Sequence, residues 1–402
     1  MRAHQLLARL ISEVDQRIDR VRYSPDRLTR GRKRVRIDPY LGFGTSDRVW
    51  VSGRVVAQGP IRPAEDTDSR WRNLLHMYRR MRSGKIPRAR LRATLGRVAT
   101  ELTADDEGYY ATWLAHDEPS YEHALWHDVE LELLAPLRRG HDPVRATGKV
   151  LIPPHSASFG VISDIDDTVI QTDATSLVRM ARTVLLGNAR TRLPFAGVAA
   201  FYRALQRGAT GDAGNPLFYV SSSPWNLFDL LVEFFELEGI PLGPLLLRDW
   251  GVSRDELFPK RHGPHKLEAI ERIMATYPRL PFVLVGDSGQ EDPEVYSDVV
   301  HRHGDRILAV YIRNLTGLVR ASAVHALSRE VVSAGSSLVL ADDTLAAARH
   351  AAEHGWLAPT ALAVIGEACR EDESGEAGSP VAEEGRQRED TPTMVIAVQR
   401  QD

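Results

Sequence analysis

The sequence has few of the features that mark secreted or membrane-spanning proteins. Its 402 residues contain one cysteine, Cys369, so the chain can form no internal disulfide and no cysteine-based zinc cluster. No apolar run reaches the roughly 18 residues that a membrane span needs, and no N-terminal apolar segment precedes a small-residue cleavage site. We therefore expect a cytoplasmic protein of a reducing compartment, which would contact a membrane only peripherally.

Charged residues are plentiful but unevenly distributed. They make up 26% of the chain and hydrophobic residues 43%, as in a soluble protein of about two or three domains. Although the net charge is only −3, the N-terminal part of the chain is basic. Residues 1–40 carry eleven Arg or Lys and five Asp or Glu, and residues 70–92 carry nine Arg or Lys and no Asp or Glu. From Glu367 onward, ten acids face four bases. This asymmetry indicates an anionic surface as a partner.

The N-terminal segment is both amphipathic and basic. Residues 1–22 place apolar side chains at helical spacing, which predicts a helix that either packs on the protein body or lies on a membrane or a partner. The run from Arg30 to Arg36 carries five cations, which match nucleic acid and anionic phospholipid head groups equally well. We assign residues 1–36 to a basic amphipathic helix and linker, and we expect no nucleic-acid partner.

Residues 37–153 are rich in short β-type segments and predict a small sandwich-like domain. The turn residues from Ala104 to Gly108 predict a hairpin between two of them. Ser69 to Arg82 is typical of a helix with an outward basic face, followed by further cations. That face is either simply solvated or a docking site for anionic lipid, at about 1 kcal/mol per cation. The expected strands are Val49–Ala57, Leu91–Thr100, Tyr109–Leu114, Val129–Leu134 and Val144–Ile152.

The most informative stretch follows a short apolar run at Phe159–Ile162. This run predicts a buried parallel strand that delivers Asp164, Asp166 and Thr168 to its carboxyl end, where open α/β sheets bind ligands. Carboxylates at this spacing repel one another unless a cation such as Mg²⁺ neutralises them. Taken alone, the stretch has an alternative interpretation as an acidic turn that leaves a strand.

Three further motifs follow in order. Leu217–Val220 predicts a second strand, which ends at Ser221 and Ser222 before a helical stretch, an arrangement suited to holding phosphate. Lys266 opens an amphipathic helix. Phe282–Val285 predicts a third strand, which ends in a glycine-containing turn with Asp287, Ser288 and Asp292. A later Asp342-Asp343-Thr344 sequence lacks the paired spacing, and we interpret it as a helix cap.

Together these four motifs resemble those of the haloacid dehalogenase-like phosphohydrolases. The exact residues of the motifs resemble one branch of these proteins, the actin-patch-type phosphatidate phosphatases and their bacterial relatives. These residues are DIDDT, YVSSSPWNL, HK and GDSGQEDPEVY. The resemblance covers roughly residues 150–356. It implies a doubly wound Rossmann-like parallel sheet of haloacid dehalogenase type over residues 154–366, preceded by the β-rich domain. We expect the acidic tail over 367–402 to be disordered, because it lacks hydrophobic periodicity.

The resemblance also implies roles for individual residues. Asp164 would be the nucleophile that forms an aspartyl-phosphate, and Asp166 the general acid and base. Asp164, the backbone carbonyl of Asp166, and Asp287 would hold Mg²⁺.

The remaining motif residues would bind phosphate or orient the groups that do. Phosphate would be bound by Ser221, Ser222 and Lys266, and Lys266 would also balance the charge of the nucleophile. Thr168, Ser288 and Asp292 would orient the residues that contact the metal or the phosphate.

The function implied by the resemblance is Mg²⁺-dependent hydrolysis of phosphatidate to diacylglycerol and phosphate at an anionic membrane surface. One alternative is a phosphatase of the same chemistry that acts on a soluble phosphomonoester or a phosphoprotein. Another is a catalytically inactive membrane-binding module, although the presence of every charged motif residue argues against it. The motifs themselves indicate phosphoryl transfer and do not choose the substrate.

Overall fold

The structure is a computed structural model of the chain. It describes residues 34–58, 84–116, 124–137, 142–165, 196–248, 262–288, 291–313, 327–331, 333, 335–341, 343–374 and 395–396. The chain forms two compact units, one built from the residues before Pro153 and the other from most of those after it. Several predictions fall outside the described residues: the helices over 1–22 and 69–82, the residues Asp166 and Thr168, and most of the acidic tail.

The first unit is a nine-stranded sheet with the order β1-β3-β2-β9-β8-β5-β6, in which β4 and β7 also pair with β3. Apart from the parallel pair β2 and β9, the paired strands of this sheet run antiparallel. The strands are β1 (Arg34–Pro39), β2 (Gly42–Gly44), β3 (Arg48–Gln58), β4 (Gly84–Lys85), β5 (Arg90–Leu95), β6 (Val98–Thr103), β7 (Tyr109–Ala115), β8 (Trp126–Ala135) and β9 (Arg145–Leu151).

Alternation of apolar and polar residues explains the core of this unit. In β5, Leu91, Ala93 and Leu95 are buried, whereas Arg90, before Leu91, and Arg92, after it, are exposed. Successive side chains of a strand point to opposite faces, so this sequence buries one face and leaves the other in water. The sheet is observed, whereas the sandwich-like arrangement stays a prediction.

The predicted hairpin at Ala104–Gly108 is wrong. The turn is present, with Gly108 at φ +81°, where an added Cβ would lie 2.7 Å from the carbonyl oxygen of Val55. However, β6 pairs with β5 and β7 pairs with β3, so the turn carries the chain from one partner strand to another. A turn residue pattern fixes the local backbone but not which strands pair.

The second unit contains a seven-stranded sheet with the order β12-β11-β10-β13-β14-β15-β16. All neighbours are parallel except β16, which pairs antiparallel with β15. The order along the sheet reverses between β10 and β13. The strands are β10 (Gly160–Asp164), β11 (Leu217–Pro224), β12 (Leu245–Arg248), β13 (Phe282–Asp287), β14 (Ile307–Arg313), β15 (Ser337–Ala341) and β16 (Val395–Ile396).

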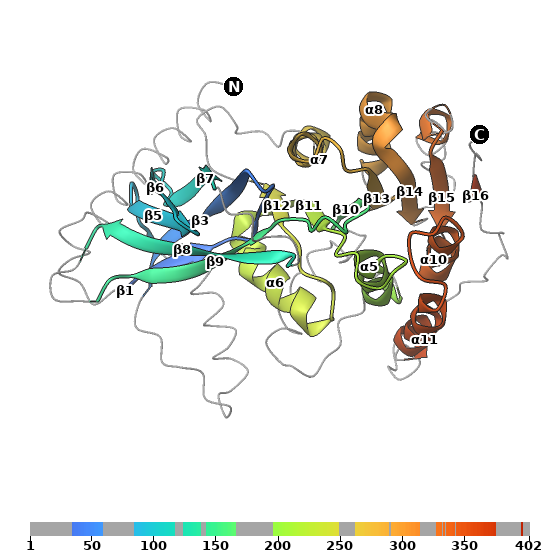
Figure 1. The fold of residues 1–402 in the computed structure, drawn as a ribbon, viewed down its shortest axis with the longest axis horizontal. Coiled ribbons are helices and arrows are strands. Elements are labelled where there is room, and N and C mark those ends of the chain that lie inside the picture. The colour runs from blue at the N-terminus through green and yellow to red at the C-terminus, as the bar shows by residue number, and fades with distance from the viewer. Residues whose placement is uncertain are drawn as a thin grey trace, which may run out of the picture. The chain divides into compact units, whose positions relative to one another are not determined.

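Helices cover both faces of this sheet (Figure 1), with α7 and α8 on one face and α5, α6, α10 and α11 on the other. Because both faces are covered, β10 and β13 are buried along their whole length. This burial explains why each was visible in the sequence as an apolar run. The helices are α5 (Val198–Arg207), α6 (Phe228–Leu237), α7 (His262–Thr276), α8 (Asp292–His303), α10 (Thr344–Glu353) and α11 (Ala361–Ser374), with short 3₁₀ turns at Trp225–Leu227 and Gly304–Arg306.

Two predicted boundaries need correction. Arg34 and Val35, assigned to the N-terminal linker, begin β1, and the predicted start of the disordered tail at Glu367 falls inside α11. The carboxylate of Asp372 accepts a hydrogen bond from the backbone N–H of Gly197 at 2.8 Å, which ties α11 to the start of α5. The prediction of disorder is therefore wrong for residues 367–374. Among the described helices, none is both long and apolar enough to cross a membrane.

Candidate active site

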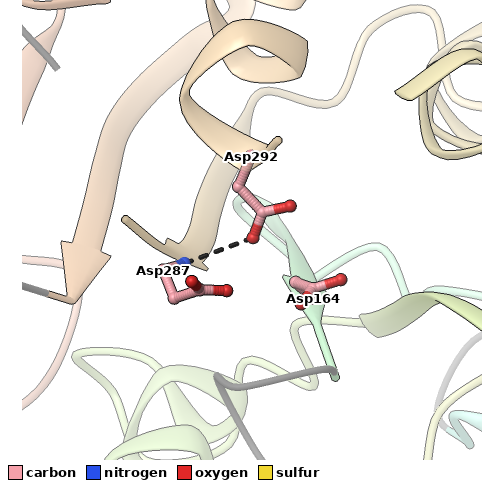
Figure 2. A group of neighbouring side chains, drawn as sticks. All are labelled: Asp164, Asp287 and Asp292. Carbon is pink, nitrogen blue, oxygen red and sulfur yellow. Dashed lines mark hydrogen bonds between the residues drawn. The ribbon is translucent and has the colours of Figure 1, made fainter. Parts of the chain in front are cut away.

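The candidate site lies at the carboxyl edge of the parallel sheet. Asp164 is the last residue of β10 and Asp287 the last residue of β13, and these two strands pair in parallel. Asp292 is the first residue of α8, which begins five residues after the end of β13. Figure 2 shows the three carboxylates gathered where these elements meet. The sequence expectation that separate strand ends bring Asp164 and Asp287 together is confirmed.

Lys266 joins these carboxylates from α7. Its Nζ lies 2.6 Å from Oδ1 of Asp164 and 2.7 Å from Oδ1 of Asp292. The three side chains are 2%, 1% and 0% exposed, so these ion pairs are screened little by water. Burial by itself lowers the pKa of Lys266, but the charges of Asp164 and Asp292 outweigh it and raise the pKa above its ordinary value. The ammonium group therefore stays charged beside the carboxylates.

Asp292 is held in place by its surroundings. Its Oδ2 accepts a hydrogen bond from the backbone N–H of Asp287 at 3.2 Å. The same oxygen lies against Gly286, where an added Cβ would approach it to 2.6 Å and would approach the ring of Tyr296 to 2.7 Å. Glycine at this position therefore makes room for the carboxylate, which explains why the strand ends in Gly-Asp.

The three carboxylates form a group that could hold a cation. Each of Asp164, Asp287 and Asp292 offers an oxygen within 4.8 Å of the others, and all three residues are buried. Two of these carboxylates pair with the ammonium group of Lys266. Carboxylates held this close repel one another unless a cation lies between them. Hard divalent cations prefer carboxylate oxygens, and the donor set therefore fits Mg²⁺. The sequence analysis assigned Asp292 to orientation, yet the structure places it with Asp164 and Asp287.

The predicted phosphate-binding serines lie on the adjacent strand. Val220 of β11 is in register with Asp164, and Ser221 follows it at this edge of the sheet. Ser221 is buried, and its Oγ accepts a hydrogen bond from the backbone N–H of Ser223 at 2.9 Å. Ser222 is partly buried. The structure thus places both residues beside the strand that carries Asp164, whereas their contact with phosphate stays a prediction.

Ser288 and Tyr296 complete the described surroundings. Ser288 is buried, and its backbone N–H donates to the carbonyl oxygen of Arg313 at 2.9 Å. The hydroxyl of Tyr296 donates to the carbonyl oxygen of Val285 at 2.7 Å. Burial raises the pKa of Tyr296, and the nearby carboxylate of Asp292 raises it further. The sequence analysis missed Tyr296, although its position four residues after Asp292 places both on one side of α8.

The basic cluster predicted as a docking surface is partly described, in the first unit. The guanidinium groups of Arg88 and Arg90 lie 2.9 Å from the carboxylates of Asp106 and Glu101, respectively. Arg92 lies 3.3 Å from Glu101 and 3.6 Å from Glu132. The pairs of Arg90 and Arg92 join neighbouring strands, whereas Arg88 and Asp106 lie in loops, and all three arginines are exposed. For these three arginines the structure favours the interpretation as a solvated face.

The segment that carries the site is similar to a known protein family and to two proteins of yeasts. Residues 159–314 match the family described as "Phosphatidate phosphatase APP1, catalytic domain". The chain is 32% identical to phosphatidate phosphatase APP1 of Saccharomyces cerevisiae over 187 residues, which cover 46% of this chain and 30% of that protein. It is 28% identical to an uncharacterized protein of Schizosaccharomyces pombe over 160 residues, 39% of this chain and 25% of that protein.

Among solved structures, a carbohydrate acetylesterase from Xanthomonas citri aligns over 73% of this chain and 72% of that chain. Its TM-score is 0.25 and its identity 12%. The chain spans less than a third of the length of the two yeast relatives. Asp164, Ser221, Lys266, Asp287 and Asp292 all lie within the matched segment. These matches support an APP1-type catalytic domain at residues 159–314.

Proposed function

We propose that this protein is a phosphatidate phosphatase that hydrolyses phosphatidate to diacylglycerol and phosphate. The observation that carries the proposal is the buried group of Asp164, Asp287, Asp292 and Lys266, which lies inside the segment matched to the APP1 catalytic domain. The parallel sheet with this group at its carboxyl edge supports a haloacid dehalogenase-like fold as part of the proposal.

The chemistry must overcome the repulsion between an anionic nucleophile and an anionic phosphoryl group. Lys266 offers one positive charge, held 2.6 Å from the nucleophilic carboxylate of Asp164. Asp164 and Asp287 would hold Mg²⁺, together with the backbone carbonyl of Asp166. When bound, that ion would neutralise charge on the carboxylates and on the phosphoryl oxygens.

The reaction would proceed in two displacements. In the first, a carboxylate oxygen of Asp164 forms a bond to phosphorus while the bond to the glyceryl oxygen breaks, and Asp166 gives its proton to that oxygen. In the second, Asp166 takes a proton from water, whose oxygen bonds to phosphorus while the bond to Asp164 breaks. Phosphate leaves, and both carboxyl groups return to their starting states. The role of Asp166 is proposed from its place in the motif alone.

Two substrate classes are candidates: a membrane lipid and a soluble phosphomonoester. A membrane lipid requires the protein to reach a bilayer, and we propose a cytoplasmic protein that binds anionic membranes peripherally. The pairing of Arg88, Arg90 and Arg92 with acidic residues removes one argument for such docking. A soluble phosphomonoester therefore remains the second candidate, and the same catalytic group would serve it.

The test is phosphate release from phosphatidate in detergent micelles, with and without Mg²⁺, compared with release from small soluble phosphomonoesters. We expect Mg²⁺-dependent turnover of phosphatidate, and a loss of at least about a thousandfold in Asp164→Asn. Turnover of soluble esters alone would contradict the lipid substrate. No Mg²⁺-dependent turnover of any ester would contradict the phosphatase.

Asp343→Asn is the matched control for the nucleophile variant. Asp343 precedes α10, and its Oδ1 accepts a hydrogen bond from the backbone N–H of Ala346 at 2.7 Å, which confirms the predicted helix cap. Asparagine caps helices about as well as aspartate, so we expect turnover within about twofold of the wild type. A loss equal to that of Asp164→Asn would mean that activity follows folding and not the nucleophile.

A further inference from the structure

Two buried hydroxyl groups lie directly beside the nucleophile's backbone. Ser163 precedes Asp164 on β10, and its Oγ donates a hydrogen bond to the carbonyl oxygen of Asp164 at 2.7 Å. The hydroxyl oxygen of Tyr202, on α5, lies 2.7 Å from the same Oγ. Both residues are 0% exposed. These hydroxyl groups therefore interact with each other and with the backbone of Asp164, away from bulk water.

The direction of the two hydrogen bonds follows from counting protons. A serine hydroxyl has one proton, and Ser163 gives it to the carbonyl of Asp164. The bond between Tyr202 and Ser163 must then use the proton of the tyrosine. Burial raises the pKa of Tyr202, so the phenol keeps that proton at neutral pH. The result is a relay in one direction, from Tyr202 through Ser163 to Asp164.

The relay lies at the carboxyl end of β10, where the pairing between β10 and β13 ends. The register between β10 and β13 ends at the pair Ser163 and Val285. Two residues after Val285, the backbone N–H of Asp287 donates to Oδ2 of Asp292. The backbone at Asp164 thus keeps its pairing with Val220 of β11 but is no longer paired with β13, at the point where its side chain lies beside Lys266. A fixed backbone at this point fixes the direction of the carboxylate.

The polar character of both residues is unusual for their positions. The residues before Ser163 on β10, Val161 and Ile162, are apolar and fully buried. A buried hydroxyl is unfavourable unless it forms hydrogen bonds, and an apolar residue would satisfy the packing at lower cost. Ser163 and Tyr202 satisfy each other and together supply one donor to the backbone of Asp164.

We propose that Ser163 and Tyr202 are positioning residues, which hold the backbone of Asp164 so that its carboxylate is aligned for attack on phosphorus. This proposal rests on the proposed function of Asp164 as nucleophile. Neither hydroxyl touches the substrate. Their effect therefore falls on the rate of the chemical step and not on substrate binding.

The experiment is a double-mutant cycle with Ser163→Ala, Tyr202→Phe and the double variant, assayed for kcat and KM on the best substrate of the wild type. We expect kcat to fall about 10- to 100-fold in Ser163→Ala and about 3- to 10-fold in Tyr202→Phe, with KM changed less than about threefold. The double variant should match Ser163→Ala within about twofold, because Tyr202 acts only through Ser163. Multiplicative losses, or a kcat unchanged in Ser163→Ala, would overturn the relay.

Tyr219→Phe is the matched control. Tyr219 is also 0% exposed and lies on the neighbouring strand β11, in register with Ser163. Its hydroxyl donates to the carbonyl oxygen of Pro241 at 2.7 Å and not to the relay. We expect a similar loss of thermal stability in Tyr219→Phe and Tyr202→Phe, with kcat reduced only in the latter. Equal kcat in the two variants would show that Tyr202 is structural.

A second readout keeps the relay testable if the wild type turns over no ester, the result that would contradict the proposed function. Binding of Mn²⁺ alone, measured by calorimetry, depends on the direction of the Asp164 carboxylate but not on turnover. We expect Ser163→Ala to weaken Mn²⁺ binding about fivefold or more and Tyr219→Phe to leave it unchanged. Equal affinities of Ser163→Ala and the wild type for Mn²⁺ would overturn the relay independently of any substrate.

Discussion

The two units of this protein arrange charge in opposite ways. On the sheet of the first unit, Arg90 and Arg92 are exposed to solvent and pair with Glu101 on the neighbouring strand. In the second unit, three buried carboxylates lie together, and two of them, those of Asp164 and Asp292, pair with the ammonium group of Lys266. Exposed pairs of this kind stabilise a fold weakly, whereas an excess of buried like charge opposes folding. A cluster of buried carboxylates, and not the number of charged residues, therefore indicates the candidate functional site.

The largest effect is expected from removing one of the buried charges. We expect Asp287→Asn to lower turnover of phosphatidate about a thousandfold and, without divalent cations, to raise the free energy of unfolding by about 1–2 kcal/mol, because one repelling charge is lost. Activity assays and urea unfolding in a chelating buffer measure both. If Asp287→Asn were inactive and also less stable without metal, the carboxylate would be a structural partner and the comparison would fail.

Removing the positive charge of Lys266 should have the next largest effect. We expect Lys266→Met to lower the free energy of unfolding by about 3–5 kcal/mol in chelating buffer, because Asp164 and Asp292 would stay buried without their partner. Urea unfolding measures the loss, and added Mg²⁺ should recover part of it. An unchanged midpoint would mean that water or another group already compensates these carboxylates.

A buried titratable group outside the site provides a pH test. His350 of α10 is buried, its Nδ1 lies 3.0 Å from the hydroxyl oxygen of Tyr311, and burial, followed by the neighbouring His354, lowers its pKa to about 4. In the unfolded chain its pKa would be about 6.5. As pH falls from about 6.5 to 4, the unfolded state gains a proton that the folded state does not, so stability falls.

The expected loss from His350 is about 3 kcal/mol, complete below about pH 4. Other groups titrate in the same range, so the measurement is the difference in free energy of unfolding between the wild type and His350→Gln as a function of pH. We expect that difference to change between pH 6.5 and 4 and to stay level above pH 7. A level difference throughout would show that the imidazole is not kept neutral by the fold.

Gly286→Ala tests the space on which Asp292 depends. The added Cβ would approach Oδ2 of Asp292 to 2.6 Å, so the carboxylate must move. We expect turnover to fall about tenfold, since displacement of a supporting residue disturbs the alignment of Lys266 and Asp287. A crystal structure of the variant should show Asp292 shifted. Unchanged turnover with a shifted Asp292 would separate this residue from the reaction.

The smallest effect is expected on the first-unit sheet. Arg90 pairs with Glu101 at 2.9 Å, and both side chains are largely exposed. We expect Arg90→Ala to change the unfolding midpoint by less than about 2 °C, and 1 M salt to reduce even that difference. A shift as large as that of Lys266→Met would mean that the surface pairs form a cooperative network, and the contrast between the units would disappear.

The sequence predicts the strand ends of the site well, because both faces of the parallel sheet are buried. Burial makes β11 and β13 visible as apolar runs, and Asp287 then follows from its place at the end of such a run. Lys266 is predicted by its place at the opening of an amphipathic helix, since α7 begins four residues earlier. Local pattern and chain order are sufficient for these residues.

Other features depend on contacts between distant parts of the chain. The relay needs α5 to bring Tyr202 against Ser163, and no spacing in the sequence reports that contact. The second part of α11, residues 367–374, is predicted as disordered tail, because the residue that anchors Asp372 is Gly197, 175 residues away. The turn after β6 was recognised, but strand pairing is decided by the whole sheet. Long-range packing fixes these features.

The most direct test of the account is to trap the proposed intermediate on Asp164. Phosphatidate labelled in its phosphoryl group is mixed with the protein and Mg²⁺, the reaction is quenched in acid within milliseconds, and the labelled peptide is identified by mass spectrometry. The account predicts label on the peptide that contains Asp164 and none in Asp164→Asn. Turnover of phosphatidate by Asp164→Asn at the wild-type rate, with no labelled peptide in either protein, would contradict it.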